Sequence, residues 1–282
     1  MSLPPLKEFL ADKSWTGCAI AHRGAWHDTA ENSLRAVDDA LAVGCQYVEI
    51  DVQETIDGVP FCLHDISLLR TTARAVNAAA HQWPQIAETP LLMGLGGAHA
   101  GQSDQTLPSL DAMLDHCKGR AYVDLDVKRP HQLPRIAEAL RRTDSGSQVN
   151  LKMWVHGRAD LDFALSIQDT LGTILKPIVL IDRSNIDHML EVIRKLDAPV
   201  VEANFDCWDS VLRLSDAAWS EGRDIFVNTL DEARSTFVMD SGALCDPRGT
   251  WGALLDAGVR MLQTDEPDAL CSYLKIHRKA NG

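Results

Sequence analysis

The stretch CQYVEIDVQETIDGVPFCLHD, residues 45–65, carries the strongest indication of both fold and site. Gln46–Val52 is a short run of aromatic and β-branched residues, which predicts a buried strand. Glu49 and Asp51 are two positions apart in this run, so their side chains point to the same face. Two buried like charges are costly unless a cation neutralises them, and a hard divalent ion such as Mg²⁺ or Ca²⁺ suits two carboxylates. The same spacing also fits an ion pair or a surface strand.

A hairpin follows this strand. Asp57-Gly58 has the composition of a tight turn, and Val59–Leu63 predicts a second extended segment that we treat as an extension of the first strand. The hairpin would return His64 and Asp65 to the neighbourhood of the two carboxylates. An imidazole beside a candidate metal site suggests acid–base chemistry.

The composition is that of a globular protein of 282 residues, with 45% hydrophobic and 24% charged residues. This length allows one large α/β barrel or two ordinary domains. The net charge of −13 argues against non-specific binding to nucleic acid or to anionic membranes. It would also repel a phosphate substrate weakly, so a phosphate site needs local cations.

Seven cysteines, odd in number and widely spaced, favour free thiols in a reducing compartment over a disulfide framework or a zinc site. Pro4, Pro5, Lys7 and Glu8 interrupt the apolar residues near the start, so we expect no secretory signal there. No apolar run approaches the roughly 18 residues that span a bilayer, and we expect no stable membrane insertion. A cytoplasmic location is the expectation, although Met-Ser-Leu also fits a leader that replaces a trimmed signal.

Short apolar runs alternate with helical patterns along most of the chain. The eight predicted strands are Cys18–His22, Gln46–Val52, Ala121–Lys128, Val149–Val155, Lys176–Asp182, Pro199–Asn204, Asp224–Thr229 and Val259–Thr264. Eight such units in one chain of this length predict a closed (β/α)₈ barrel, an α/β fold. We expect a single domain over residues 1–282, with an inserted loop subdomain at about residues 66–108 on the face formed by the carboxyl ends of the strands.

The unusual polar residues fall at the ends of the predicted strands, where βα barrels carry their active sites. His22 and Arg23 end the first strand, and Asp126 and Lys128 end the third. Arginine supplies paired donors for phosphate. Glu31 lies just before the next helix, where its carboxylate could cap that helix or reach a metal.

Two further side chains have a predicted place. Asn32 is expected to cap the helix that runs to Ala42. Trp154 shares a strand face with Lys152, and its ring either packs against a substrate head group or belongs to the core.

The segment AHRGAWHDTAENSLRAVDDALAVGCQYVEIDVQETIDGVPFCLHDISLLRTT, residues 21–72, resembles the N-terminal signature of the glycerophosphodiester phosphodiesterases. That family shows His-Arg-Gly, Pro-Glu-Asn-Thr, Glu-x-Asp, His-Asp and a Leu-x-Arg-Thr-Thr-like run in this order. LPSLDAML, residues 107–114, and GVRMLQTDEPDAL, residues 258–270, are similar to later family motifs. The resemblance therefore extends from about residue 18 to residue 270.

The resemblance implies roles for individual residues. His22 and His64 match the two catalytic histidines of the family. Glu49 and Asp51 match its metal-binding pair, and Asp126 matches a third metal ligand. Lys128 and Arg23 match the groups beside the phosphate, and Glu31 matches a residue beside the phosphate and the metal. Three positions depart from the family pattern. Ala30 replaces proline, Asp126 is shorter than the usual glutamate, and Asn228 stands where many members carry tryptophan.

The activity implied is the metal-dependent hydrolysis of glycerophosphodiesters, such as deacylated phospholipid head groups, with one Mg²⁺ or Ca²⁺. His22 would act as base and His64 as acid, and the nucleophile is either water or a neighbouring hydroxyl of the substrate. The alternatives are a lysophospholipase D-type phosphodiesterase and a non-catalytic barrel that binds a phosphorylated ligand. In each case the partner is a small molecule.

Overall fold

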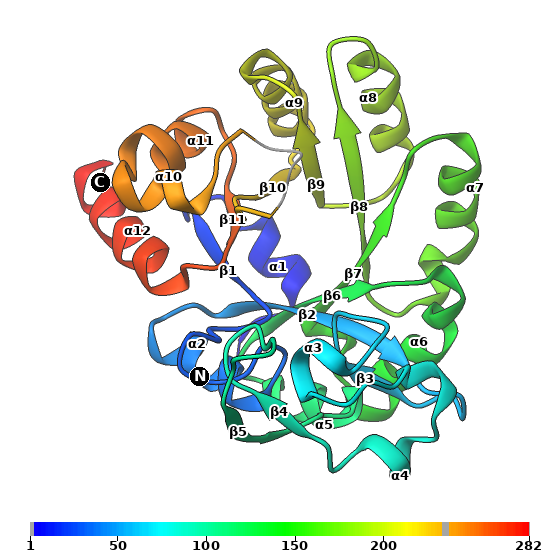
Figure 1. Ribbon diagram of the computed structural model, residues 1–282. Helices are drawn as coiled ribbons and strands as arrows, with labels where there is room; N and C mark the ends of the chain where they lie inside the picture. Colours follow the sequence, from blue (N-terminus) through cyan, green and yellow to red (C-terminus); the bar gives the residue numbers. More distant parts are fainter. Residues whose placement is uncertain (1–2, 233–236, 282) are drawn as a thin grey trace. The chain divides into compact units, whose positions relative to one another are not determined.

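A computed structural model describes residues 3–232 and 237–281, and side chains up to residue 277. The strands are β1 (Cys18–His22), β2 (Tyr47–Glu54), β3 (Pro60–Cys62), β4 (Pro90–Leu92), β5 (Gln102–Thr106), β6 (Tyr122–Val127), β7 (Val149–Trp154), β8 (Ile174–Ile181), β9 (Val200–Phe205), β10 (Asp224–Asn228) and β11 (Met261–Thr264). Helices follow most of them along the chain (Figure 1).

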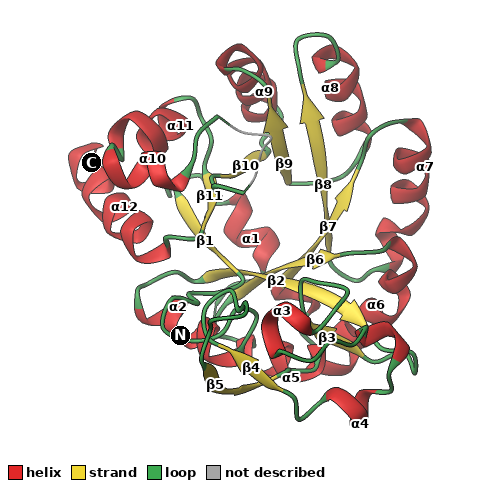
Figure 2. Cartoon of the chain, in the orientation of Figure 1, coloured by secondary structure: helices red, strands yellow, loops and turns green. Residues whose placement is uncertain are grey.

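The helices are α1 (Leu6–Ala11), α2 (Leu34–Ala42), α3 (Leu69–Thr72), α4 (Trp83–Ile86), α5 (Leu110–Cys117), α6 (Leu133–Thr143), α7 (Arg158–Ile167), α8 (Ile186–Lys195), α9 (Trp208–Ser220), α10 (Asp240–Cys245), α11 (Ala253–Asp256) and α12 (Pro267–Asn281). The alternation of helix and strand that the sequence predicts is visible in Figure 2. Among the described helices, none has both the length and the apolar character needed to cross a bilayer.

The strand order confirms the predicted barrel. In the described chain the hydrogen-bonded order is β1–β11–β10–β9–β8–β7–β6–β2–β3, and β1 also pairs with β2. Eight strands therefore close on themselves, while β3 pairs antiparallel to β2 as the predicted hairpin extension. The strand pairs β1–β2, β2–β6, β8–β9, β9–β10 and β10–β11 are parallel, as a βα barrel requires.

The chain divides into two compact units. The first comprises Met1–Leu3, Ala21–Leu151 and Thr170–Thr173, and the second comprises Pro4–Ile20, Lys152–Asp169 and Ile174–Gly282. The expectation of a single domain remains a prediction.

The predicted insertion belongs to the first unit and contains α3, α4 and a two-stranded sheet of β4 and β5. Its apolar side chains pack on β3 and on the loop after β1, in a buried cluster of Ala30, Phe61, Leu63, Leu68, Ala78, Ile86, Leu91 and Leu107. Ala30 also forms a β-bridge with Gly94. Because that loop follows the carboxyl end of β1, the insertion is attached to the face that the sequence predicts.

A buried ion pair organises the interior of the second unit. Lys176 is fully buried, and its Nζ lies 2.8 Å from Glu202 Oε2 and 3.2 Å from the centroid of the Phe226 ring. Lys152 Nζ lies 3.7 Å from the same carboxylate oxygen, and Asn228 Nδ2 donates to Glu202 Oε1 at 2.9 Å. Burial alone would raise the pKa of Glu202, but Lys152 and Lys176 lower it from 4.5 to about 2.

Replacing this carboxylate tests the pair. Glu202→Gln leaves two buried ammonium groups without their counter-charge, so we expect the free energy of unfolding to fall by about 3–5 kcal/mol at pH 7. The lowered pKa means that the wild-type carboxylate stabilises the fold above pH 4.5, and this contribution is lost as the pH falls toward 2. The difference between wild type and variant should therefore narrow in acid.

Urea unfolding followed by tryptophan fluorescence at several pH values measures both effects. Glu191→Gln, on the exposed face of α8, is the matched control and should change stability little. A Glu202→Gln protein as stable as wild type at pH 7 would contradict the assignment.

Candidate metal centre and active site

The His-Arg-Gly turn at the end of β1 has a backbone that only particular residues adopt easily. Arg23 and Gly24 have φ values of 57° and 80°. A Cβ atom on Gly24 would lie 2.7 Å from the backbone carbon of Ala36 in α2, so glycine is required by space as well as by conformation. The turn packs closely on α2, and Ala25 N donates to Ala36 O at 2.9 Å.

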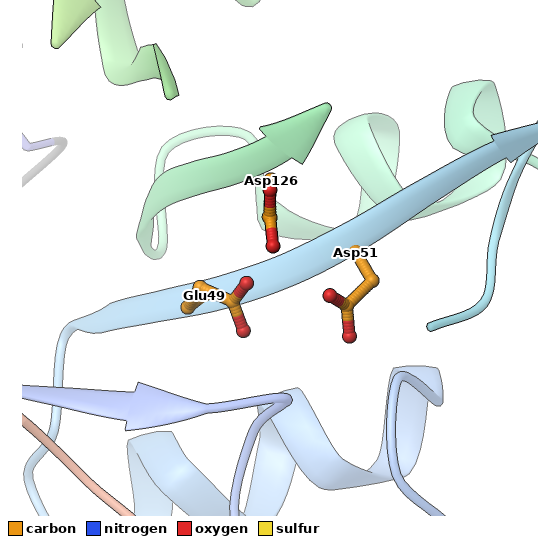
Figure 3. A group of neighbouring side chains, drawn as sticks. All are labelled: Glu49, Asp51 and Asp126. Carbon is orange, nitrogen blue, oxygen red and sulfur yellow. The ribbon is translucent and has the colours of Figure 1, made fainter. Parts of the chain in front are cut away.

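Three carboxylates converge where β2 and β6 lie side by side. Glu49 and Asp51 project from the same side of β2, and Asp126 reaches toward them from β6 (Figure 3). The parallel register pairs Asp51 with Asp126 directly. One oxygen from each of the three groups lies within 4.8 Å of the others, while Glu49 and Asp51 are only 1% exposed. The structure thus brings together the three ligands predicted for the metal.

Two cations face this acidic group. Lys128 Nζ lies 2.5 Å from Asp51 Oδ1 and 2.6 Å from Asp126 Oδ2, and Arg23 Nε lies 3.1 Å from Asp51 Oδ2. Burial alone would raise the pKa of Asp51, but Lys128 and Arg23 hold it far below its ordinary value. Asp51 is therefore ionised and available as a ligand at any ordinary pH.

Both predicted catalytic histidines lie in the same unit and near the same carboxylate. His22 is the register partner of Glu49, and His64 follows Leu63, whose N donates to Asp51 O at 3.1 Å. His64 and His22 each contribute to lowering the pKa of Asp51, which places both rings within its electrostatic reach. The structure therefore brings these two histidines to the acidic group.

Asn32 has a different role from the one that the sequence predicts. The helix cap of α2 is Ser33, whose Oγ accepts a hydrogen bond from Ala36 N at 3.1 Å. Asn32 has a φ of 55°, and its amide clamps Asp51: Nδ2 donates to Asp51 Oδ2 at 2.9 Å, and Asp51 N donates to Asn32 Oδ1 at 3.0 Å. Asparagine tolerates this left-handed backbone, which directs its side chain to the strand instead of the helix end.

Glu31 lies between two guanidinium groups. Its carboxylate is buried, and it accepts from Arg23 Nη1 at 3.1 Å and from both terminal nitrogens of Arg70 at 2.7 Å. In the described residues, Glu31 is not one of the carboxylates that could share an ion. Sequence reasoning gave Arg70 no role, although it occurs in the quoted LLRTT run.

The donor set fits a hard divalent cation. The described residues of this region include five carboxylates and three cations: Glu31, Glu49, Asp51, Asp65 and Asp126 against Arg23, Arg70 and Lys128. Negative charge is therefore in excess. Asp51 Oδ1 is buried and meets the Lys128 ammonium outside hydrogen-bond geometry, so it retains a lone pair for a ligand. Oxygen-only ligands of this kind suit Mg²⁺ or Ca²⁺.

Two residues that the sequence singles out belong to the second compact unit. Trp154 ends β7 with its side chain 45% exposed, and its ring stacks on that of His156 with centroids 5.0 Å apart. It is therefore not a core tryptophan. Asn228 ends β10 and donates to Glu202.

Fold and site together define a class of protein: a parallel βα barrel with a candidate metal centre and two histidines near the carboxyl ends of its strands. Comparison with known proteins then gives the family. A sequence model of the glycerophosphoryl diester phosphodiesterase family matches residues 22–269. The chain belongs to this family of phosphoric diester hydrolases.

Individual relatives agree with this assignment. The rat protein glycerophosphodiester phosphodiesterase 1 is 50% identical over 54 residues, which are 19% of this chain and 16% of the rat protein. The match thus spans about one sixth of that relative.

Solved structures extend the likeness to nearly the whole chain. A glycerophosphoryl diester phosphodiesterase from Parabacteroides distasonis superposes with a TM-score of 0.77 at 16% identity, covering 98% of this chain and 94% of that one. A phosphodiesterase from Oleispira antarctica, in complex with its product sn-glycerol-3-phosphate, gives a TM-score of 0.65 at 19% identity, covering 92% and 96%. At such identities these likenesses establish the fold.

Asn32 provides a test of the site. Asn32→Ala removes both hydrogen bonds to Asp51, so the carboxylate loses its orientation, and we expect the affinity for Mg²⁺ or Ca²⁺ to fall about 10- to 100-fold. Isothermal titration of each metal into the purified protein measures this. Asn77→Ala is the control, because Asn77 makes the same kind of bond to a backbone N–H, that of Ala79 in the insertion. Equal affinity in both variants would show that the clamp has no effect on the metal.

Proposed function

We propose that this protein hydrolyses glycerophosphodiesters to glycerol phosphate and an alcohol, with a divalent cation and two histidines. One observation carries the proposal: within the first compact unit, Asp51 belongs to a group of three carboxylates that could share an ion. The charges of Lys128, Arg23, His64 and His22 all act on this carboxylate and lower its pKa. Membership of a phosphodiesterase family supports the reaction class.

Glu49, Asp51 and Asp126 would hold the metal, with Mg²⁺ and Ca²⁺ as the candidate ions. When bound, the cation would neutralise charge on the phosphate oxygens as a Lewis acid. The excess of carboxylates over cations supports this need, because an anionic phosphodiester would otherwise meet a negative site. Arg23 and Lys128 already lie against the carboxylates and would bind the remaining phosphate oxygens.

The two histidines would divide the proton transfers. His22 would take a proton from the nucleophile, either water or a neighbouring hydroxyl of the substrate, as a new P–O bond forms. His64 would give a proton to the alcohol oxygen as the old P–O bond breaks. The side chain of His64 is 39% exposed whereas His22 is buried, which suits the former to a leaving group that departs into solvent.

The substrate class rests on the relatives. The Oleispira antarctica enzyme was solved with sn-glycerol-3-phosphate as product, which supports glycerol phosphate as a product here. A lysophospholipase D-type substrate, which keeps one acyl chain, is the alternative, and Trp154 is the proposed contact for the head group. Small molecules are the proposed partners.

We infer a reducing, cytoplasmic location from the thiols. The seven cysteines are odd in number and widely spaced, and burial raises the pKa of Cys62 and of Cys117, the latter to about 12. Such thiols are protonated and unreactive at neutral pH.

Removal of the metal provides the first test of the function. Chelator should abolish hydrolysis of glycerophosphocholine, and added Mg²⁺ or Ca²⁺ should restore it. Glu49→Gln should lower kcat by about two to three orders of magnitude, because the variant loses a ligand of the cation that would stabilise the negative charge of the transition state. Release of choline, measured in a coupled assay, follows the reaction. Undiminished turnover in excess chelator would show that the reaction does not need the ion.

The histidines provide the second test. His22→Ala and His64→Ala should each lower kcat by about two to four orders of magnitude, because each removes one proton transfer. His27→Ala is the control, since this exposed ring stacks on Trp26 near the same turn. Parallel assays with lysophosphatidylcholine separate the two substrate classes. Tight binding of glycerol phosphate without any turnover would instead favour the non-catalytic alternative.

A further inference from the structure

Arg70 in α3 is the most heavily bonded side chain of the insertion. Its Nη1 and Nη2 each donate to one oxygen of Glu31 at 2.7 Å. Its Nε donates to Asp65 Oδ2 at 2.7 Å, and Nη2 also donates to Asp65 Oδ1 at 3.0 Å. The guanidinium thus holds two carboxylates in paired geometry, which arginine alone among the cationic residues provides.

Each of these carboxylates touches a residue of the proposed machinery. Asp65 Oδ1 lies 2.7 Å from His64 Nδ1, and Glu31 Oε2 lies 3.1 Å from Arg23 Nη1. An ionised carboxylate only accepts hydrogen bonds, so Nδ1 of His64 must carry a proton. In the neutral ring Nε2 then bears the lone pair, and in the charged ring it carries the proton that can be given away.

We propose that Arg70 is a positioning residue that acts on the reaction from two directions, orienting His64 through Asp65 and Arg23 through Glu31. This inference rests on the proposed function. Arg70 itself need not touch the substrate. Its planar guanidinium fixes the orientation of the Asp65 and Glu31 carboxylates, and these in turn fix the orientation of the His64 imidazole and of the Arg23 guanidinium.

The glycine-rich loop of the insertion is shaped around this residue. Leu95 O accepts a hydrogen bond from Arg70 Nη1 at 2.5 Å, and Gly97 N donates to Arg70 O at 2.7 Å. A Cβ atom on Gly96, which has a φ of 74°, would overlap the carbonyl oxygen of Arg70. The loop therefore contacts both the backbone and the guanidinium of Arg70, and this close packing explains why the stretch GLGG is rich in glycine.

The pKa shifts of Asp65 and Arg70 indicate that their ion pair persists over a wide pH range. Burial by itself would raise the pKa of Asp65, but hydrogen bonds from Arg70 and His64 lower it to about 2. Burial would lower the pKa of Arg70, but Glu31 and Asp65 raise it above its ordinary value. The Arg70–Asp65 pair thus stays charged across the working range of an enzyme.

Four substitutions separate the effect of Arg70 on His64 from its effect on Arg23. Asp65→Asn keeps the size of the side chain but weakens the hold on His64, so we expect kcat to fall about 10- to 100-fold with little change in KM. Glu31→Gln loosens Arg23, so KM should rise by a similar factor. Arg70→Gln should do both, and Arg70→Lys should restore thermal stability without restoring kcat, because an ammonium group cannot hold two carboxylates in paired geometry.

Arg74→Gln is the matched control. Arg74 lies in the same insertion and donates to Gln85 O at 3.1 Å and to Thr89 Oγ1 at 2.5 Å, with no bond to the site among those described. It should leave kcat and KM unchanged. If Arg70→Gln behaves like Arg74→Gln in the kinetics, Arg70 is merely structural and the inference is wrong. Where Arg70→Gln does not fold, Arg70→Lys and Asp65→Asn decide the question in the same way.

A spectroscopic measurement keeps the inference separate from the proposed function. Long-range ¹H–¹⁵N correlation spectra of the full chain should show His64 protonated at Nδ1 in wild type and a mixture of tautomers in Arg70→Gln and Asp65→Asn. An unchanged tautomer in both variants would overturn the inference even in a protein without diesterase activity. A wild-type protein with no activity but with the expected tautomer shift would reject the proposed function alone.

Discussion

The burial of like charges on the paired strands β2 and β6 is the constraint on which the first compact unit depends. Glu49 and Asp51 are almost inaccessible, and Asp126 is held beside them by the register of parallel strands. Carboxylates placed so close are stable only when cations share the space, and Lys128 and Arg23 supply part of that charge. The tight turn after β1 and its contact with α2 follow from this need, because they bring Arg23 to Asp51.

Much of this arrangement could be predicted from sequence because its causes are local. The two-residue period of a strand places Glu49 and Asp51 on one face whatever the rest of the chain does. Parallel strands gather their carboxyl ends at one edge, so His22 and Lys128 could be assigned to the same site once eight strand–helix units were counted. The bounds of β1 and the hairpin with β3 were predicted for the same reason.

Partners of polar side chains could not be predicted in this way, because they depend on turns and on packing between distant segments. Asn32 has the composition of a helix cap, yet its left-handed backbone directs its amide to Asp51, and Ser33 takes the cap. The bonds of Arg70 form only because the insertion folds back on the loop after β1. Lys176 looked like the start of an apolar strand, and its ion pair with Glu202 depends on the pairing of β8 with β9.

Strain in the turn after β1 shows how the fold sustains this site. Arg23 and Asn32 both have left-handed backbones, which cost a non-glycine residue about 1–3 kcal/mol each, and Asn32 N donates to Arg23 O at 3.0 Å. The bonds of Asn32 to Asp51, the cap made by Ser33 and the bridge from Ala30 to the insertion offset that cost. The strained residues are the two that contact Asp51 from the loop. Folding therefore orients the Asn32 amide and the Arg23 guanidinium around the Asp51 carboxylate before any ligand binds.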